Sequence, residues 1–146
     1  MNEDIKSYVF NNNMIVLYFG NVSEIRKKAF NRNKQPFLIT DQVVTFCNTK
    51  TIEPAYWINI KSLKYDEKSV EITFNDKKEV LFSAPKNELP GIFGIIIDIL
   101  QRVLTTQQKE KLDLRKFRLM SKSNQLIGYS LLSRFISYSE INSKNW

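Results

Sequence analysis

Apolar and polar side chains alternate along the middle of the chain, which is the pattern of β-strands that bury one face. In residues 69–74 the apolar side chains alternate with Glu71 and Thr73, so these two are expected to point outward. Residues 78–84 repeat the pattern. Further strands are predicted over residues 14–25, 36–40, 43–48 and 55–63. Because the six strands follow one another through short connections, the sequence predicts an antiparallel meander.

Two positions within these strands carry local expectations. Gly20 interrupts the first predicted strand and indicates a bulge or bend there. In residues 55–63, Tyr56 and Ile58 alternate with Trp57, so a single strand is predicted with Tyr56 and Ile58 on one face and Trp57 on the other.

The pattern changes to that of a helix after Pro85. Apolar residues recur at three- and four-residue spacing up to Val103, and Asn87 is the expected N-cap. The predicted helix is apolar over more than half its surface, so it is expected to be buried against the open end of the sheet. The sequence therefore predicts an α+β, mainly β domain over residues 1–104: a barrel of antiparallel strands capped by a C-terminal helix.

Residues 105–146 form a predicted helical extension. Residues 105–122 are polar and basic, and the expected structure is a helical or irregular connector. A last helix is predicted from about Asn124 to Glu140. One stripe of this helix carries Ile127, Leu131, Phe135 and Tyr138. Since the capped barrel is complete without it, the stripe is expected to contact another partner, in the same chain or in a second copy.

Positive charge is concentrated in two segments. The chain has a net charge of +7, yet residues 61–104 are neutral. Residues 109–122 form one basic segment. The other, residues 26–34, contains no acid and carries Arg26, Lys27, Lys28, Arg32 and Lys34. Such patches are typical of contact with acidic lipid, nucleic acid or an acidic protein.

Little catalytic chemistry is available. The chain has no histidine and one cysteine, and no phosphate-binding, hydrolase or EF-hand motif occurs. We therefore expect no cofactor, no metal site and no enzymatic activity. Cys47 is expected to be a core residue, and barrel packing is expected for at least one of Tyr56 and Trp57. Nucleic-acid binding through residues 109–122 is disfavoured, because few aromatic residues interleave with the basic ones.

The sequence also favours a reducing compartment. The acidic start MNEDIKSY does not have the pattern of a signal peptide, and the longest apolar run, residues 92–97, is far shorter than a membrane span. With a single cysteine there is no disulfide framework. A cytoplasmic protein is expected.

Three stretches resemble a known family. The order of elements from about residue 14 to residue 104 is that of the pleckstrin-homology (PH) architecture. The run FLITDQVVTFCNTKTIEPAYWINIKSL resembles strands 2 to 4 of the PH-like domains of CARMIL proteins and, more loosely, of class I myosin tails. LFSAPKNELPGIFGIIIDILQRVL resembles the passage into the capping helix, and NQLIGYSLLSRFISYSEINSKNW resembles the helical linker that follows.

The resemblance implies a function. CARMIL PH-like domains bind acidic phospholipid with little headgroup specificity, their linker helps dimerisation, and a leucine-rich repeat domain follows. In PH domains the loop between the first two strands forms the rim of the lipid site, and residues 26–34 fall there. Gln35 and Pro36 replace the basic strand start of headgroup-specific domains. The capping-protein-binding segment of the family is not in this sequence, so no capping activity is implied.

These features fit two functions. In the first, the chain is a membrane-targeting module of an actin-cytoskeleton regulator, peripheral at the plasma membrane, a homodimer through its last helix and a fragment of a larger protein. The alternative is a PH-like scaffold that binds a peptide or protein in the groove between a strand and the capping helix. Loss of binding at high salt would favour the first function.

Overall fold

The computed structural model describes residues 1–25, 34–47, 52–66 and 68–115. These residues form three α-helices, one 3₁₀ turn and eight strands. The elements are α1 (Glu3–Asn11), β1 (Val16–Glu24), β2 (Lys34–Thr40), β3 (Val43–Phe46), β4 (Ala55–Tyr56), η1 (Trp57–Asn59), β5 (Ile60–Tyr65), β6 (Val70–Phe74), β7 (Glu79–Ser83), α2 (Leu89–Val103), α3 (Thr106–Lys111) and β8 (Asp113–Arg115).

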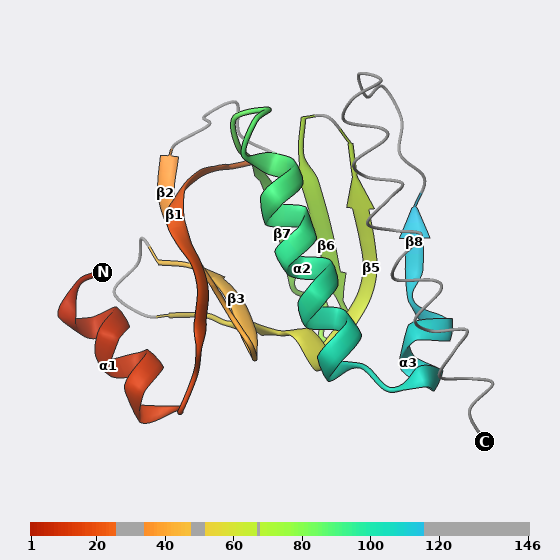
Figure 1. Ribbon diagram of the computed structural model, residues 1–146, viewed down its shortest axis with the longest axis horizontal. Helices are drawn as coiled ribbons and strands as arrows, with labels where there is room; N and C mark the ends of the chain where they lie inside the picture. Colours follow the sequence, from red (N-terminus) through yellow and green to blue (C-terminus); the bar gives the residue numbers. More distant parts are fainter. Residues whose placement is uncertain (26–33, 48–51, 67, 116–146) are drawn as a thin grey trace.

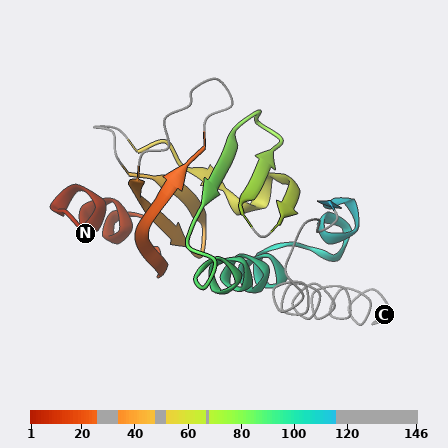
Figure 2. The same ribbon diagram turned by 90° about the horizontal axis from the view of Figure 1, so that it is seen from above.

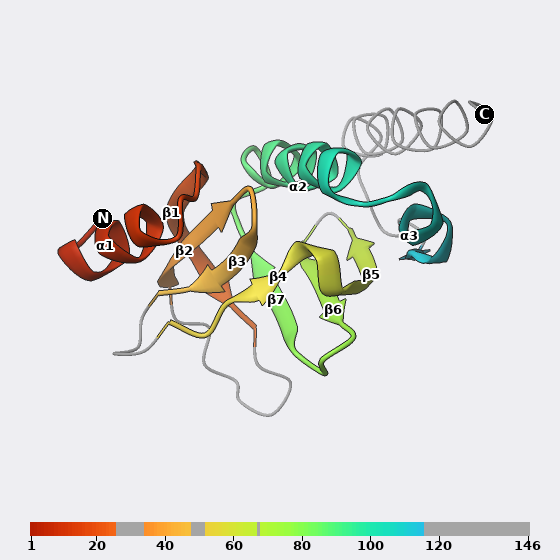
Figure 3. The same cartoon turned by 90° about the horizontal axis from the view of Figure 1, so that it is seen from below.

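The strands form one sheet in the order β4-β3-β2-β1-β7-β6-β5-β8. All pairings among β1 to β7 are antiparallel, as predicted, and β8 adds to the edge of β5 in parallel. β1 pairs with β2 along most of its length but with β7 only at Ser23 and Glu24. The strands therefore fall into two groups joined at β1, and α2 lies along the open side between them (Figure 1; Figure 3).

The inner face of the sheet and one side of α2 enclose a single apolar core. On β6 the apolar residues are buried while Glu71 and Thr73 are partly exposed, which confirms the predicted alternation. Buried residues of α2 are Leu89, Pro90, Ile92, Phe93, Ile96, Ile97, Ile99 and Leu100. The prediction that this helix is buried against the open side of the sheet is therefore confirmed.

The prediction of one strand over residues 55–63 is wrong. The chain makes β4, then the 3₁₀ turn η1, then β5, and this turn directs Trp57 into the core. The Trp57 side chain is fully buried, and its Nε1 donates a hydrogen bond of 3.0 Å to the Thr40 carbonyl oxygen. Tyr56 and Ile58 are 40% and 57% exposed. Burial of the large indole with its donor satisfied outweighs the period-two pattern here.

An N-terminal helix was not predicted. Asn2 caps α1 by accepting a 2.9 Å hydrogen bond from the Ile5 amide, and Glu3 and Asp4 lie in the first turn, where negative charge is favourable. Ile5 packs with Leu38 and Cys47 in a second, smaller apolar cluster, which makes α1 a cover for the outer side of β2 and β3 (Figure 2).

Two local expectations are also corrected. Glu88, not Asn87, precedes the first residue of α2, and no side chain caps that helix. The pairing of β1 with β2 shifts between Val16 and Tyr18, so the bulge lies before Gly20. At Gly20 a Cβ atom would lie 2.6 Å from the Tyr18 hydroxyl, so the glycine makes room for that side chain.

The start of the predicted extension is built into the fold. Thr105 and Gln108 form a capping box at the start of α3, and the Gln108 side chain donates 3.3 Å to the Ile58 carbonyl oxygen. β8 then pairs with β5 from Ser62 to Lys64. Residues 105–115 are thus partly helical, as expected, and also supply an edge strand.

Candidate functional site

Most of the predicted site residues lie outside the described residues. These are Arg26, Lys27, Lys28 and Arg32 of the basic loop, and Ile127, Leu131, Phe135 and Tyr138 of the predicted last helix. Lys34 is described: it is the first residue of β2, is exposed, and lies opposite Ser23 of β1.

The attachment points of the basic loop are well defined. β1 runs antiparallel to β7, and the Ile25 amide donates a 3.0 Å hydrogen bond to the Leu81 carbonyl oxygen. Ile25 therefore lies beside the middle of β7. Lys34 lies opposite Ser23, which pairs with Ser83, so the other end of the loop lies beside the last residue of β7. From Ile25, β1 points toward the start of β7.

Lysines gather around the β6–β7 turn, which precedes the start of β7. The turn between β6 and β7 carries Lys77 and Lys78, and the Lys78 Nζ donates a 2.7 Å hydrogen bond to the Pro54 carbonyl oxygen just before β4. The Asn75 amide donates 2.8 Å to the Asn59 carbonyl oxygen, which places the start of β5, and with it Lys61, beside the turn.

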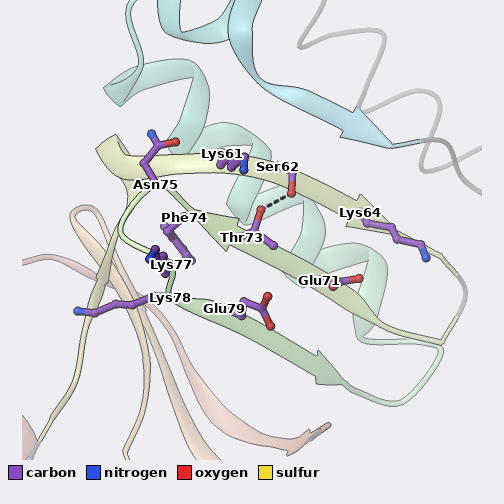
Figure 4. A pocket seen from close by; sticks show the side chains of 10 residues that line it. All are labelled: Lys61, Ser62, Lys64, Glu71, Thr73, Phe74, Asn75, Lys77, Lys78 and Glu79. Atoms are coloured by element: carbon purple, nitrogen blue, oxygen red, sulfur yellow. Dashed lines mark hydrogen bonds between the residues drawn. The ribbon is translucent and has the colours of Figure 1, made fainter. Parts of the chain in front are cut away.

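We call the outer face of β5, β6 and the start of β7 the lysine surface. It surrounds a shallow hollow of about 530 Å³ (Figure 4). Its residues are Lys61, Ser62, Lys64, Glu71, Thr73, Phe74, Asn75, Lys77, Lys78 and Glu79. With four lysines to two glutamates, the surface is positively charged.

Some of these lysines lie close to acidic residues of the same chain. Lys64 lies opposite Glu71 in the β5–β6 register, and the hydroxyl groups of Ser62 and Thr73 are hydrogen-bonded beside them (Figure 4). The Lys78 Nζ is 4.0 Å from the Asp76 Oδ2. Lys61 and Lys77 are the exposed lysines best placed to meet an external anion. Exposed lysines of this kind attract anions through long-range charge rather than through a shaped site.

No catalytic arrangement is seen among the described residues. They contain no group of three or more Cys, Asp or Glu residues that could hold a metal ion. Cys47 is buried as expected, and burial raises the pKa of its thiol to about 11, so the thiol is protonated at neutral pH. In the same part of the chain, no helix has the length and apolar character that a membrane crossing needs.

The lysine surface was not anticipated from the sequence. Its residues come from three strands and the β6–β7 turn, and residues 61–104 are neutral overall. A signal was present in the outward positions of the predicted strands, where Glu71, Thr73 and Glu79 alternate with core residues. Only the observed register of β5, β6 and β7 places the lysines next to these residues on one surface.

Comparison with known proteins finds structural likeness without sequence likeness. No family model and no curated protein matches the chain. The chain is similar to the hSac2 domain of the human phosphoinositide phosphatase Sac2, with a TM-score of 0.55 and 9% identity over 82% of this chain and 89% of that one.

Two further structures show the same likeness. One holds the linker-DH/PH domains of p115-RhoGEF, with a TM-score of 0.51 and 11% identity; the match covers 72% of this chain and 36% of that one. The fold is PH-like. The chain is also similar to the C-terminal domain of an unknown protein from Leishmania infantum, with a TM-score of 0.50 and 12% identity over 66% of this chain and 95% of that one.

These comparisons confirm the predicted PH-like fold class. At sequence identities of 9% to 12%, the structural likeness establishes the fold alone. The resemblance to CARMIL proteins stays a prediction from the sequence.

Proposed function

We propose that the chain is a non-catalytic module that binds acidic phospholipid surfaces with low headgroup specificity. The contact consists of the basic loop, Arg26 to Lys34, together with Lys61 and Lys77. One observation carries the proposal. β1 runs antiparallel to β7 and the Ile25 amide is bonded to Leu81, so the end of β1 points toward the start of β7 and the lysines of the β6–β7 turn.

Magnitudes favour a reversible attachment. Each basic residue near an anionic leaflet contributes about 1 kcal/mol, so the five basic residues of the loop supply about 5 kcal/mol. Lys61 and Lys77 raise this to about 7 kcal/mol. The contribution falls with added salt because exposed charges are screened.

Low headgroup specificity follows from the start of β2. Gln35 is 6% exposed, and Pro36 follows it within the strand, so neither offers a basic side chain to a phosphate. Selective recognition of a phosphorylated headgroup needs several fixed donors, whereas exposed lysines act as point charges.

The finer parts of the proposal rest on the sequence resemblance over residues 37–63, 81–104 and 124–146. They are a CARMIL-type protein that regulates the actin cytoskeleton, a cytoplasmic location peripheral to the plasma membrane, and a leucine-rich repeat domain beyond residue 146. We also propose that the PH-like domain ends at residue 104 and that a helical extension begins at residue 105. The apolar stripe of the last helix is proposed to contact a partner or a second copy of the chain.

The experiment is flotation of the full chain with phosphatidylserine-containing vesicles. One variant reverses three loop charges, Arg26, Lys27 and Lys28 to Glu. A second reverses Lys61 and Lys77, which leaves the hydrogen bond of Lys78 intact. The control reverses Lys6, Lys86 and Lys111, which are exposed residues of α1, the β7–α2 connection and α3.

We expect both site variants to lose binding and the control to retain most of it. The three-charge loop variant and the control alter net charge equally, so the comparison separates position from total charge. Equal loss in both would reject the site.

A protein-interaction scaffold is the second candidate. It is favoured by an apolar groove between β1 and α2, described below. Binding to a protein partner through that groove would survive high salt, whereas binding to lipid through lysines would not.

A further inference from the structure

An apolar groove of about 260 Å³ lies between β1 and α2. Its walls are Ile15, Leu17, Ile95, Ile99 and Val103, and its rim carries Asp41, Asp98 and Arg102. The groove lies at the start of β1, where the described residues pair β1 with β2 but not with β7.

The groove leaves apolar surface in water. Ile15 is 62% exposed and Leu17 is 40% exposed. Leu17 lies at the register shift between β1 and β2. A concave apolar surface rimmed by polar residues is typical of an interaction site.

Phe10 lies five residues before Ile15, which lines the groove. It lies in the last turn of α1 and is 82% exposed, the highest value among the large apolar side chains of the described residues. Phe10 does not line the groove of its own chain. The connection from α1 to β1 is short (Figure 1), and the Asn13 amide is bonded to the Phe10 carbonyl oxygen two residues before Ile15 of the groove, so Phe10 lies close to the groove along the chain.

This connection is held firmly. The Asn13 amide donates to the Phe10 carbonyl oxygen at 3.2 Å, and the Met14 amide donates to the Val9 carbonyl oxygen at 3.0 Å. The Ile15 amide donates to the Asp41 Oδ1 at 2.8 Å. Ile5 fixes the other end of α1 to the sheet. Phe10 is therefore presented on an ordered support at low entropic cost.

We propose that the occupant of the groove is Phe10 of a second copy of this chain. In a two-fold dimer the same patch serves both partners, so each copy inserts its Phe10 into the groove of the other. The patch carries both a protruding aromatic ring and an apolar hollow. Its rim carries charges of both signs, Asp41 and Asp98 with Arg102, which suits contact with an identical rim better than contact with a strongly charged partner.

Sedimentation equilibrium of the full chain over a range of concentrations tests the proposal. We expect a monomer–dimer equilibrium in the wild type. Phe10→Asp and Ile15→Arg should each raise the dimer dissociation constant at least about tenfold. Both side chains are mostly exposed, so the folded state should survive the changes. Ile58→Asp is the matched control, since Ile58 is 57% exposed and lies outside the groove.

Mixing the two variants gives a stricter test. The Phe10→Asp copy keeps an intact groove, and the Ile15→Arg copy keeps its Phe10. The mixture can therefore form one of the two contacts, and association should be stronger in the mixture than in either variant alone. A monomeric wild type, a dimer insensitive to Phe10→Asp, or a mixture that associates no better than its components would each overturn the proposal.

The same experiment distinguishes this interface from the predicted stripe of the last helix. Leu131→Asp changes that stripe and leaves Phe10 and the groove intact. If Leu131→Asp abolishes dimers that Phe10→Asp leaves unchanged, the groove is not the dimer contact. The proposed membrane binding is measured separately by flotation, so either proposal can fail alone.

Discussion

Tyr65 of β5 and Phe93 of α2 stack face to face, with ring centroids 4.1 Å apart and ring planes 5° from parallel. Each side chain is 1% exposed. The pair joins the capping helix to the half of the sheet that carries the lysine surface. The placement of α2, and with it the groove beside β1, depends on such contacts between helix and sheet.

Phe93→Ala should lower the free energy of unfolding by about 3–5 kcal/mol, because it leaves a cavity between α2 and β5. Urea denaturation of the full chain measures the change. The control is Phe10→Ala, which removes the same atoms from a side chain that is 82% exposed. A Phe93→Ala variant as stable as Phe10→Ala would contradict the packing described for α2.

Trp57→Phe should cost about 1–3 kcal/mol from the hydrogen bond alone, because the Thr40 carbonyl oxygen would lose a buried donor. The smaller ring adds a cavity, so the measured loss of stability should exceed that range. Tyr56→Phe is the neighbouring control and should be within about 0.5 kcal/mol of wild type, since Tyr56 is an exposed residue. Equal stabilities of the two variants would mean that Trp57 is not the core residue of this turn.

Cys47 should react slowly with thiol reagents in the folded chain. Burial raises the pKa of its thiol from 9.0 to about 11, so the thiolate fraction at pH 8 falls roughly a hundredfold relative to the unfolded chain. The measurement is the rate of reaction with a chromogenic disulfide at pH 8, with and without urea. Similar rates in both conditions would show that the outer cluster of Ile5, Leu38 and Cys47 is open.

Stability should fall at alkaline pH. Burial, with a smaller effect of Asp66, raises the pKa of Tyr65 from 10.0 to about 12. The unfolded chain therefore loses the Tyr65 proton first, and the contribution that is complete below pH 10 is lost as the pH rises toward 12. Urea midpoints at pH 8, 10 and 11 measure the decline. Tyr65→Phe should reduce its steepness, and an unchanged slope would reject Tyr65 as a cause.

Local patterns were sufficient for much of this fold. The alternation in β6 and β7 and the three- and four-residue spacing in α2 predicted both the elements and their buried faces. The prediction of one strand over residues 55–63 was wrong because a hydrogen bond from Trp57 to Thr40, distant in sequence, decides which side chain turns inward. For α1, the cap at Asn2 and the Ile5–Val9 spacing were present, but one buried side chain is a weak periodic signal.

The candidate site was predictable only in part. The run of basic residues from Arg26 to Lys34 can be recognised in the sequence, and the predicted strand order places it between the first two strands. The positions of Lys61 and Lys77 on one surface depend on strand register and on the hydrogen bond between Asn75 and Asn59. Neither can be predicted from a segment whose net charge is zero. Phe10 and the groove come from an unpredicted helix and a bulge, so sequence periodicity could not bring them together.

Vesicle flotation of the unmodified full chain tests the central proposal most directly. Phosphatidylcholine vesicles with and without phosphatidylserine are compared at low and at high salt. We expect binding only to the acidic vesicles, and loss of this binding at high salt, because the contact is made by exposed basic residues. Equal binding to neutral and acidic vesicles, or no binding to acidic vesicles at low salt, would contradict it.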